Sequence, residues 1–325
     1  MYDNIELRRS LYTMTGKSFT QALAELDPDS AYADTDMKGL DAYERQLKRF
    51  GIRVSGPDSD LVEKFFVTAQ SAVLFPEYIR RMIKKGIDET SLAGDICAAV
   101  SYTDSMDYRG LDLTTESGEE SSIADEGSAL PVSTVRLSSQ SKRLTKFARI
   151  LNCSYESVRK QRLETFGVLL REMGASIARE MNRAAANTLR TGAPQTTVSG
   201  TAVTYADLAA FWSSMTDHNM DVMLCTPAMM ADILALDEMK FCVSDFMSSG
   251  KVRTPYGVTI IKCPEVPAKT VIGLDSGCAA ELILGTDVVV DYDKLISSQC
   301  DEITCSICAG VSKLTEGSVS VLKTN

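Results

Sequence analysis

The sequence lacks the features that would place it in a membrane or on the secretory route. No uninterrupted run of about eighteen apolar residues occurs, so no membrane-spanning helix is expected. The N-terminal sequence MYDNIELRRS has neither the basic region nor the apolar region of a signal peptide. We therefore expect a soluble protein that is not exported by that route.

The chain also lacks an excess of positive charge. It holds 34 Lys and Arg against 44 Asp and Glu, which gives a formal net charge of -10 at pH 7. Binding DNA by wholesale neutralisation of phosphates requires a large excess of Lys and Arg. Any contact with DNA should therefore be local or indirect. With 325 residues, 44% of them hydrophobic, the chain can form one large domain or two joined ones.

Histidine is almost absent, which limits nucleophilic catalysis. The only histidine is His218, in the polar stretch TDHNMD, and no nucleophile-elbow sequence accompanies it. We interpret it as a surface loop residue. Asp291 and Asp293 share one face of a predicted strand, but solvation at a turn or strand edge explains both.

Two short motifs suggest ligands and have simpler explanations. Gly16-Lys17-Ser18 resembles the end of a phosphate-binding loop, but Leu11 stands where that motif needs its first glycine. Ser18 and Gln21 have the spacing of a capping box, so a helix start is the better interpretation.

The cysteines indicate buried thiols in a reducing compartment. Cys300, Cys305 and Cys308 have the spacing of three cluster ligands in plant-type ferredoxins. However, 303–311 is predicted to be a strand, in which residues 305 and 308 point to opposite faces. We predict no metal ligand, no cofactor and no catalytic residue. The nine cysteines are an odd number, scattered through apolar runs: Cys97, Cys153, Cys225, Cys242, Cys263, Cys278, Cys300, Cys305 and Cys308.

Residues 1–70 are predicted to form short amphipathic helices between turn-rich polar segments. Such helices do not make a core, so we expect an arm that packs on something else. A helix is then expected to begin at Pro76 and to stop at Gly86, followed by a strand over 96–100.

A hairpin with charges segregated by sign follows. Its outgoing arm and tip, 104–126, carry eight acids and one base, Arg109. Its return arm and the start of the next helix, 133–162, carry eight bases and one acid, Glu156. The tip is too polar to fold on itself. The acids are Asp104, Asp107, Asp112, Glu116, Glu119, Glu120, Asp125 and Glu126. The bases are Arg136, Lys142, Arg143, Lys146, Arg149, Arg159, Lys160 and Arg162.

One helix of about ten turns is predicted from Ser154 to Arg190, ending before Gly192. Arginines interrupt its apolar series, and no second segment of comparable length pairs with it, so we expect a strut. An α/β pattern follows it. The expected elements are a helix over 205–215, a second helix that Thr226 caps, and strands over 222–225, 258–263, 270–274, 288–291, 303–311 and 318–322.

This order of parts resembles the major capsid proteins of tailed bacteriophages, which have the Hong Kong 97 fold. The resemblance covers 71–325 in order and rests on architecture rather than on one diagnostic motif. The segments that carry it are AVLFPE at 72–77, ADEG at 124–127 through Pro131, TLRTG at 188–192, TPA at 226–228, PYGV at 255–258 and CP at 263–264.

The resemblance implies an α+β fold divided as in that family. The implied parts are an N-terminal arm (1–70), the start of the peripheral domain (71–103), an extended loop hairpin (104–152), the spine helix of the peripheral domain (153–192), an axial α/β domain (200–287) and closing strands of the peripheral domain (288–325).

The implied function is a major capsid protein that assembles through hexamers and pentamers into an icosahedral shell around a phage genome. The implied partners are copies of itself, separate scaffolding, portal or decoration proteins, and packaged double-stranded DNA by non-specific proximity. The location would be the virion, after assembly in the host cytoplasm. Some family members crosslink through a loop lysine, but no lysine lies between Asp104 and Ser141 here. An encapsulin-like compartment, a soluble α/β enzyme and a non-shell virion protein are the alternatives.

The charge segregation suggests where copies would meet. An acidic tip of one copy can face the basic return arm of another, which fixes register more than it adds affinity. The candidate intersubunit contacts are Glu116, Glu119, Glu120, Asp125, Glu126, Arg136, Lys142, Arg143 and Lys146.

Overall fold

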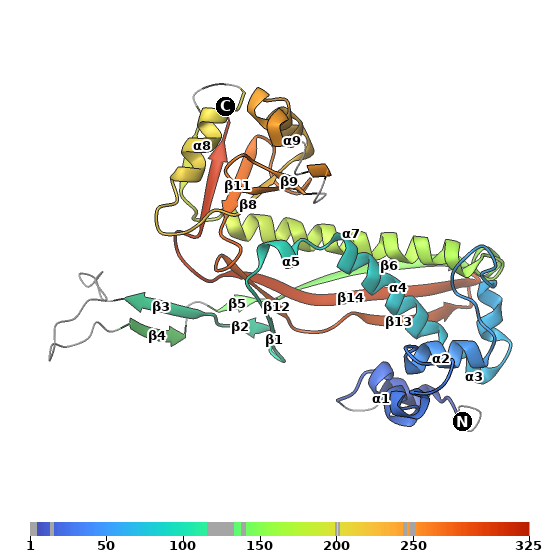
Figure 1. Ribbon diagram of the computed structural model, residues 1–325. Coiled ribbons are helices and arrows are strands. Elements are labelled where there is room, and N and C mark those ends of the chain that lie inside the picture. The colour runs from blue at the N-terminus through green and yellow to red at the C-terminus, as the bar shows by residue number, and fades with distance from the viewer. Residues whose placement is uncertain are drawn as a thin grey trace. The chain divides into compact units, whose positions relative to one another are not determined.

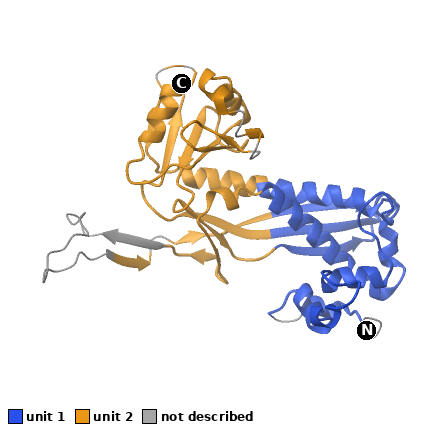
Figure 2. Ribbon diagram, in the orientation of Figure 1, with its two compact units in different colours: residues 1–90, 148–178, 288–306 blue, residues 91–147, 179–287, 307–325 orange. Residues whose placement is uncertain are grey.

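The computed structural model divides into two compact units (Figure 2). The first unit comprises Met1–Thr90, Ala148–Ala178 and Val288–Ser306, and the second comprises Ser91–Phe147, Arg179–Asp287 and Ile307–Asn325. The structure describes residues 5–13, 16–115, 133–137, 141–198, 200, 202–242, 246–247 and 251–324. Within these residues, no helix is both long and apolar enough to cross a membrane.

The first unit begins with short helical elements whose starts follow local capping chemistry. Ser18 accepts a hydrogen bond from the backbone of Gln21, whose side chain returns one, which confirms the predicted capping box. Asp41 and Glu44 cap the next α-helix in the same way. The elements are η2 (Arg9–Thr13), α1 (Phe19–Leu26), η3 (Asp29–Tyr32), α2 (Ala42–Arg49), η4 (Val62–Phe66) and α3 (Ala69–Ala72).

These elements pack on helix α4 (Phe75–Thr90) of the same chain, which corrects the expectation that they lack a core. Leu23 and Phe65 are fully buried. The hydroxyl of Tyr43 donates to the carbonyl of Leu74 at 3.3 Å. Arg45 is only 1% exposed and donates to Asp27 at 3.0 Å, so this region also holds a buried ion pair.

Helix α4 does not stop at Gly86, as the sequence had suggested, but continues to Thr90. The glycine serves a close helix contact instead of a helix end. A Cβ atom at Gly86 would lie 2.0 Å from the backbone oxygen of Arg171, and one at Gly174 would lie 2.1 Å from that of Ile83. Only residues without a side chain allow the two helix backbones to approach this closely.

The predicted long helix is interrupted near its start, so the expectation of one continuous helix from Ser154 was wrong. A short helix α6 (Tyr155–Arg159) precedes α7 (Leu163–Arg190). Between them, the carbonyl of Gln161 accepts from the Val62 amide at 2.9 Å, and the Leu163 amide donates to Asp60 at 2.8 Å. Because these backbone groups pair with another segment of the chain, they are not available for the hydrogen bonds of a continuous helix. The remaining α7 still has 28 residues.

Strand β14 (Cys300–Lys313) is the central strand of a five-stranded sheet (Figure 1). In the first unit it pairs with β13 (Val289–Leu295), and β6 (Thr145–Ser154) also pairs with it. In the second unit it pairs with β12 (Ala280–Leu284), which pairs in turn with β1 (Ala99–Tyr102). Alternate residues of β14 are buried.

The second unit also contains a six-stranded sheet with helices on it. Strand β8 is buried along its whole length because its side chains enter two separate clusters. One cluster includes Leu189 of α7, and the other includes Phe211 and Ile233. The strands, in spatial order, are β7 (Gln195–Thr197), β15 (Val319–Lys323), β11 (Thr270–Leu274), β8 (Val222–Cys225), β10 (Thr259–Lys262) and β9 (Val252–Arg253). The helical elements of this unit, besides the end of α7, are α5 (Ala93–Ile96), α8 (Tyr205–Ser213), α9 (Pro227–Leu234) and η5 (Asp237–Cys242).

We predict that Gly86→Ala and Gly174→Ala each destabilise the protein by about 1–3 kcal/mol, because the added methyl group overlaps a backbone carbonyl. Urea denaturation followed by circular dichroism measures the change. Gly94→Ala in α5 is the matched control, since a Cβ atom there has no neighbour within 4 Å. Equal stabilities for all three variants would contradict the close-contact explanation.

Candidate intersubunit surface

Two short antiparallel ladders follow β1 in the chain. One joins β2 (Asp107–Tyr108) to β5 (Lys142–Arg143), and the other joins β3 (Leu111–Thr115) to β4 (Ser133–Leu137). Among the described strands, each of these four pairs only within its own ladder. A two-stranded ladder is marginally stable in water, so this segment needs further contacts.

The base of the hairpin is held firmly within the second unit. The Tyr108 hydroxyl donates to the Glu281 carboxylate at 2.9 Å, and Ser101 donates to the same carboxylate. Burial and then the hydrogen bond to Glu281 raise the pKa of Tyr108 above its ordinary value. Leu144 is 3% exposed and lies against Gly285 and Gly310. The base of the hairpin therefore has a fixed position in the second unit.

The register places opposite charges across from one another within the hairpin. Asp112 is the Cα partner of Arg136, and Asp107 is the Cα partner of Arg143. At such positions, opposite charges can contribute roughly 0.2–1 kcal/mol. The register therefore brings acids of the outgoing arm opposite bases of the return arm within one chain.

The structure describes four of the nine candidate contact residues, and all four are exposed. They are Arg136 on β4, Lys142 and Arg143 on β5, and Lys146 on β6. The other five lie outside the described residues: Glu116, Glu119, Glu120, Asp125 and Glu126.

The sequence analysis, which considered only charged residues of the hairpin, missed an apolar stripe on β4 that consists of Val135 and Leu137. Val135 is 58% exposed and Leu137 is 66% exposed. Their Cα partners on β3 are Leu113 and Leu111, so aliphatic residues stand opposite one another at both positions. Strand alternation puts Val135 and Leu137 on the face opposite to Arg136. Grouped exposed aliphatic side chains of this kind indicate an interaction surface.

Other residues singled out in the sequence have ordinary surroundings. Lys17 pairs with Glu25 at 2.7 Å, next to the helix cap at Ser18. Asp291 and Asp293 are exposed on β13. Cys305 is buried while Cys300 and Cys308 belong to the less buried face of β14, which confirms the predicted alternation. Burial raises the pKa of Cys305 to about 12, so its thiol stays protonated near neutral pH.

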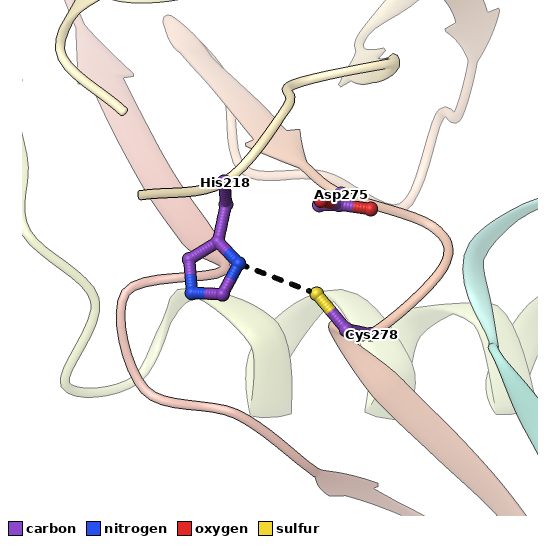
Figure 3. Close-up of side chains that lie close together, drawn as sticks. All are labelled: His218, Asp275 and Cys278. Carbon is purple, nitrogen blue, oxygen red and sulfur yellow. Dashed lines mark hydrogen bonds between the residues drawn. The ribbon is translucent and has the colours of Figure 1, made fainter. Parts of the chain in front are cut away.

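His218 lies in a loop, as predicted, but it also belongs to a cluster that the sequence analysis missed. It is half-buried, and its Nδ1 atom lies 3.5 Å from the Sγ atom of Cys278 (Figure 3). Ligand atoms of His218, Asp275 and Cys278 all lie within 4.8 Å of one another. Burial, followed by the Asp275 carboxylate, raises the pKa of Cys278. The signal in the sequence was weak, because about 60 residues separate the histidine from the cysteine.

The sequence of 138–295 matches the model of a phage capsid protein family, described as phage capsid protein. This segment contains part of the hairpin, α7 and most of the six-stranded sheet. The matched segment is similar to phage capsid proteins. No curated protein matches its sequence.

Solved structures show the fold of this capsid protein. A virus-like particle from Pyrococcus furiosus is similar, with a TM-score of 0.55 and 12% identity over 76% of this chain and 98% of that one. The capsid of a native GTA particle gives 0.53 and 12%, covering 72% and 90% of the two chains. The capsid of the cyanophage P-SCSP1u gives 0.50 and 13%, covering 71% and 88%. The predicted Hong Kong 97 fold and the predicted role of major capsid protein are confirmed.

We predict that Arg143→Glu lowers the yield of assembled particles, because it puts a like charge opposite Asp107 in the hairpin. Adding Asp107→Arg should restore the yield by recreating the pair with reversed sign. Size-exclusion chromatography with electron microscopy measures the yield. Lys160→Glu makes the same charge change on an exposed residue outside the strands and should have little effect. Failure of the charge swap to rescue would contradict pairing within the chain.

Proposed function

We propose that this capsid protein assembles through hexamers and pentamers into a closed icosahedral shell that encloses a phage genome, and that it does so in the host cytoplasm. The observation that carries the proposal is the apolar stripe of Val135 and Leu137 on a hairpin whose strands pair only with each other in the described part of the chain. In a monomer, the exposed apolar side chains of this hairpin cost free energy. In an assembly, neighbouring copies of the chain can cover them.

The hairpin supports contacts with a neighbouring copy in two ways. Its aliphatic stripe supplies apolar area, which carries most of the favourable free energy of association. Its exposed bases, Arg136, Lys142, Arg143 and Lys146, supply charge that selects orientation. Each exposed ion pair contributes only about 0–1 kcal/mol. Closed symmetry multiplies these weak contacts over many copies.

The proposal extends to the parts of the chain and their partners. The hairpin of 104–152 would be the extended loop, α7 the spine helix, and the region of 200–287 the axial domain. The protein would act as structure and not as an enzyme. Copies of itself would be its main partners, with scaffolding, portal and decoration proteins joining the same assembly. Its formal charge of -10 suits a container that must not bind its DNA tightly.

Negative-stain electron microscopy of the purified full chain tests the proposal. The expected result is closed shells, or capsomers with fivefold and sixfold symmetry. Extraction of nuclease-protected nucleic acid from particles made during infection would support DNA as the contents, whereas a protein cargo would support an encapsulin-like compartment. A chain that stays monomeric at all concentrations would contradict assembly.

We predict that the double variant Val135→Thr and Leu137→Thr loses assembly while it keeps its fold. Threonine retains strand propensity but removes the apolar surface. Because both side chains are exposed, we expect the free energy of unfolding to change by only about 0.5 kcal/mol per site. Thermal melting checks the fold, and sedimentation checks assembly. Val67→Thr, at a residue 71% exposed outside the hairpin, is the control. Normal particles from the double variant would contradict the docking role of the stripe.

A further inference from the structure

We propose that His218, Asp275 and Cys278 bind one zinc ion, with a water molecule in the fourth coordination position. The inference concerns one end of the six-stranded sheet and does not depend on the proposed shell. It starts from the cluster of nitrogen, oxygen and sulfur atoms shown in Figure 3, which lie within 4.8 Å of one another.

The fold brings these three residues together from two connections. Strands β8 and β11 are antiparallel neighbours, with Leu274 opposite Val222. The residues just before β8 and just after β11 therefore emerge at the same end of the sheet. His218 lies in the first connection, while Asp275 and Cys278 lie in the second. The second is a tight turn, in which the Cys278 amide donates to the Asp275 carbonyl at 3.1 Å.

The distance between the two best zinc ligands fits one ion. Zinc binds cysteine sulfur at about 2.3 Å and histidine nitrogen at about 2.0–2.1 Å, usually in tetrahedral geometry. Two such ligands of one ion lie about 3.6 Å apart. The Sγ atom of Cys278 and the Nδ1 atom of His218 are separated by 3.5 Å.

The surroundings orient the ligand atoms as in metal sites. The Nε2 atom of His218 lies 3.2 Å from the Glu316 carbonyl, which can only accept, so we assign the ring proton to Nε2. Nδ1 then presents its lone pair toward Cys278. Histidine ligands generally hold their other nitrogen on such an acceptor. The Asp275 carboxylate is fixed by the amides of Asn219 and Gly277, each at 3.1 Å.

The same geometry argues against two other uses of the cluster. In a catalytic triad the carboxylate holds one ring nitrogen and the nucleophile contacts the other. Here a backbone carbonyl holds Nε2, so Asp275 does not orient the ring. Calcium and magnesium prefer oxygen ligands alone, whereas imidazole and thiolate suit zinc. The nearby Asp221 carboxylate accepts from the amide of Ser276 at 2.7 Å and from its hydroxyl at 2.5 Å. Its oxygens are not among the ligand atoms that lie within 4.8 Å of one another.

Zinc binding would replace hydrogen bonds within the cluster by a metal crosslink between the two connections. The S–H bond of Cys278 breaks as the zinc–sulfur bond forms, and the proton leaves to solvent. The ion would tie the segment before β8 to the turn after β11. Through the hydrogen bond from His218 to Glu316, it would also hold the turn between β14 and β15. A rise in stability with zinc is therefore expected.

The test is a cobalt titration of the purified, metal-free full chain. The expected result is one cobalt ion per chain, with the near-ultraviolet absorption band of a thiolate–cobalt bond and visible bands of tetrahedral cobalt. Zinc should displace the cobalt and raise the melting temperature. Absence of the thiolate band from the unmodified chain would overturn the proposal.

Three variants assign the ligands. Cys278→Ser, His218→Gln and Asp275→Asn should each weaken zinc binding by at least about tenfold and reduce the zinc-dependent rise in melting temperature. Asp275→Asn has nearly the same shape, which keeps the test meaningful if another variant misfolds. Cys242→Ser, at a partly buried cysteine outside the cluster, should bind zinc like the unmodified chain. Equal zinc affinity of Cys278→Ser and the unmodified chain would also overturn the assignment.

Discussion

The close contact between helices α4 and α7 is the constraint on which the first unit depends. Gly86 and Gly174 let two backbones meet where any side chain would collide with a carbonyl oxygen. Helix α4 is thereby held on α7 along one side, while its other side buries the short N-terminal helices. Tyr43 hydrogen-bonds to Leu74 at the start of α4, so the N-terminal region follows the position of that helix. A shift of α4 would disturb both sets of contacts.

The buried ion pair of Arg45 and Asp27 has a similar effect on a smaller scale. Removing one partner of such a pair costs about 3–5 kcal/mol, whereas the pair itself adds little net stability. Its value lies in orientation, because the guanidinium also donates to the Leu40 and Asp27 carbonyls. The connections between α1 and α2 are therefore held by directed bonds. Apolar contact alone would leave several arrangements of these short helices open.

The sequence predicted the large elements well and the close contacts poorly. Helical periodicity located α7, and short continuous apolar runs located β8 and β11, which are buried along their whole length. It placed the start of the long helix too early, because the carbonyl of Gln161 pairs with Val62, about a hundred residues away. It also interpreted Gly86 as a helix stop, because a glycine that fits a crossing looks the same in sequence as one that ends a helix. Both errors concern tertiary contacts that override local preference.

The sequence analysis chose the candidate contact residues by their charge. The strand register places some of these residues opposite residues of the other charge in the same hairpin. A base opposite an acid on the neighbouring strand, such as Arg143 opposite Asp107, can set the hairpin's own alignment without a second copy. The sequence analysis did not connect His218 with Cys278, because no local sequence pattern shows which strand ends lie next to each other in the fold. The residue types can be read from the sequence, whereas their partners follow only from the pairing of the strands.

Charge and apolar surface consequently have separate tasks in the hairpin. Strand alternation sends Arg136 to one face and the stripe of Val135 and Leu137 to the other. Slippage of the register by one residue would exchange the two faces and bury charge where apolar surface should dock. The cross-strand arrangement of charges opposes that slippage, since it would remove Arg143 from its position opposite Asp107. The register therefore sets the orientation of the apolar stripe, and in the proposed shell the stripe would supply the contact free energy that exposed ion pairs cannot.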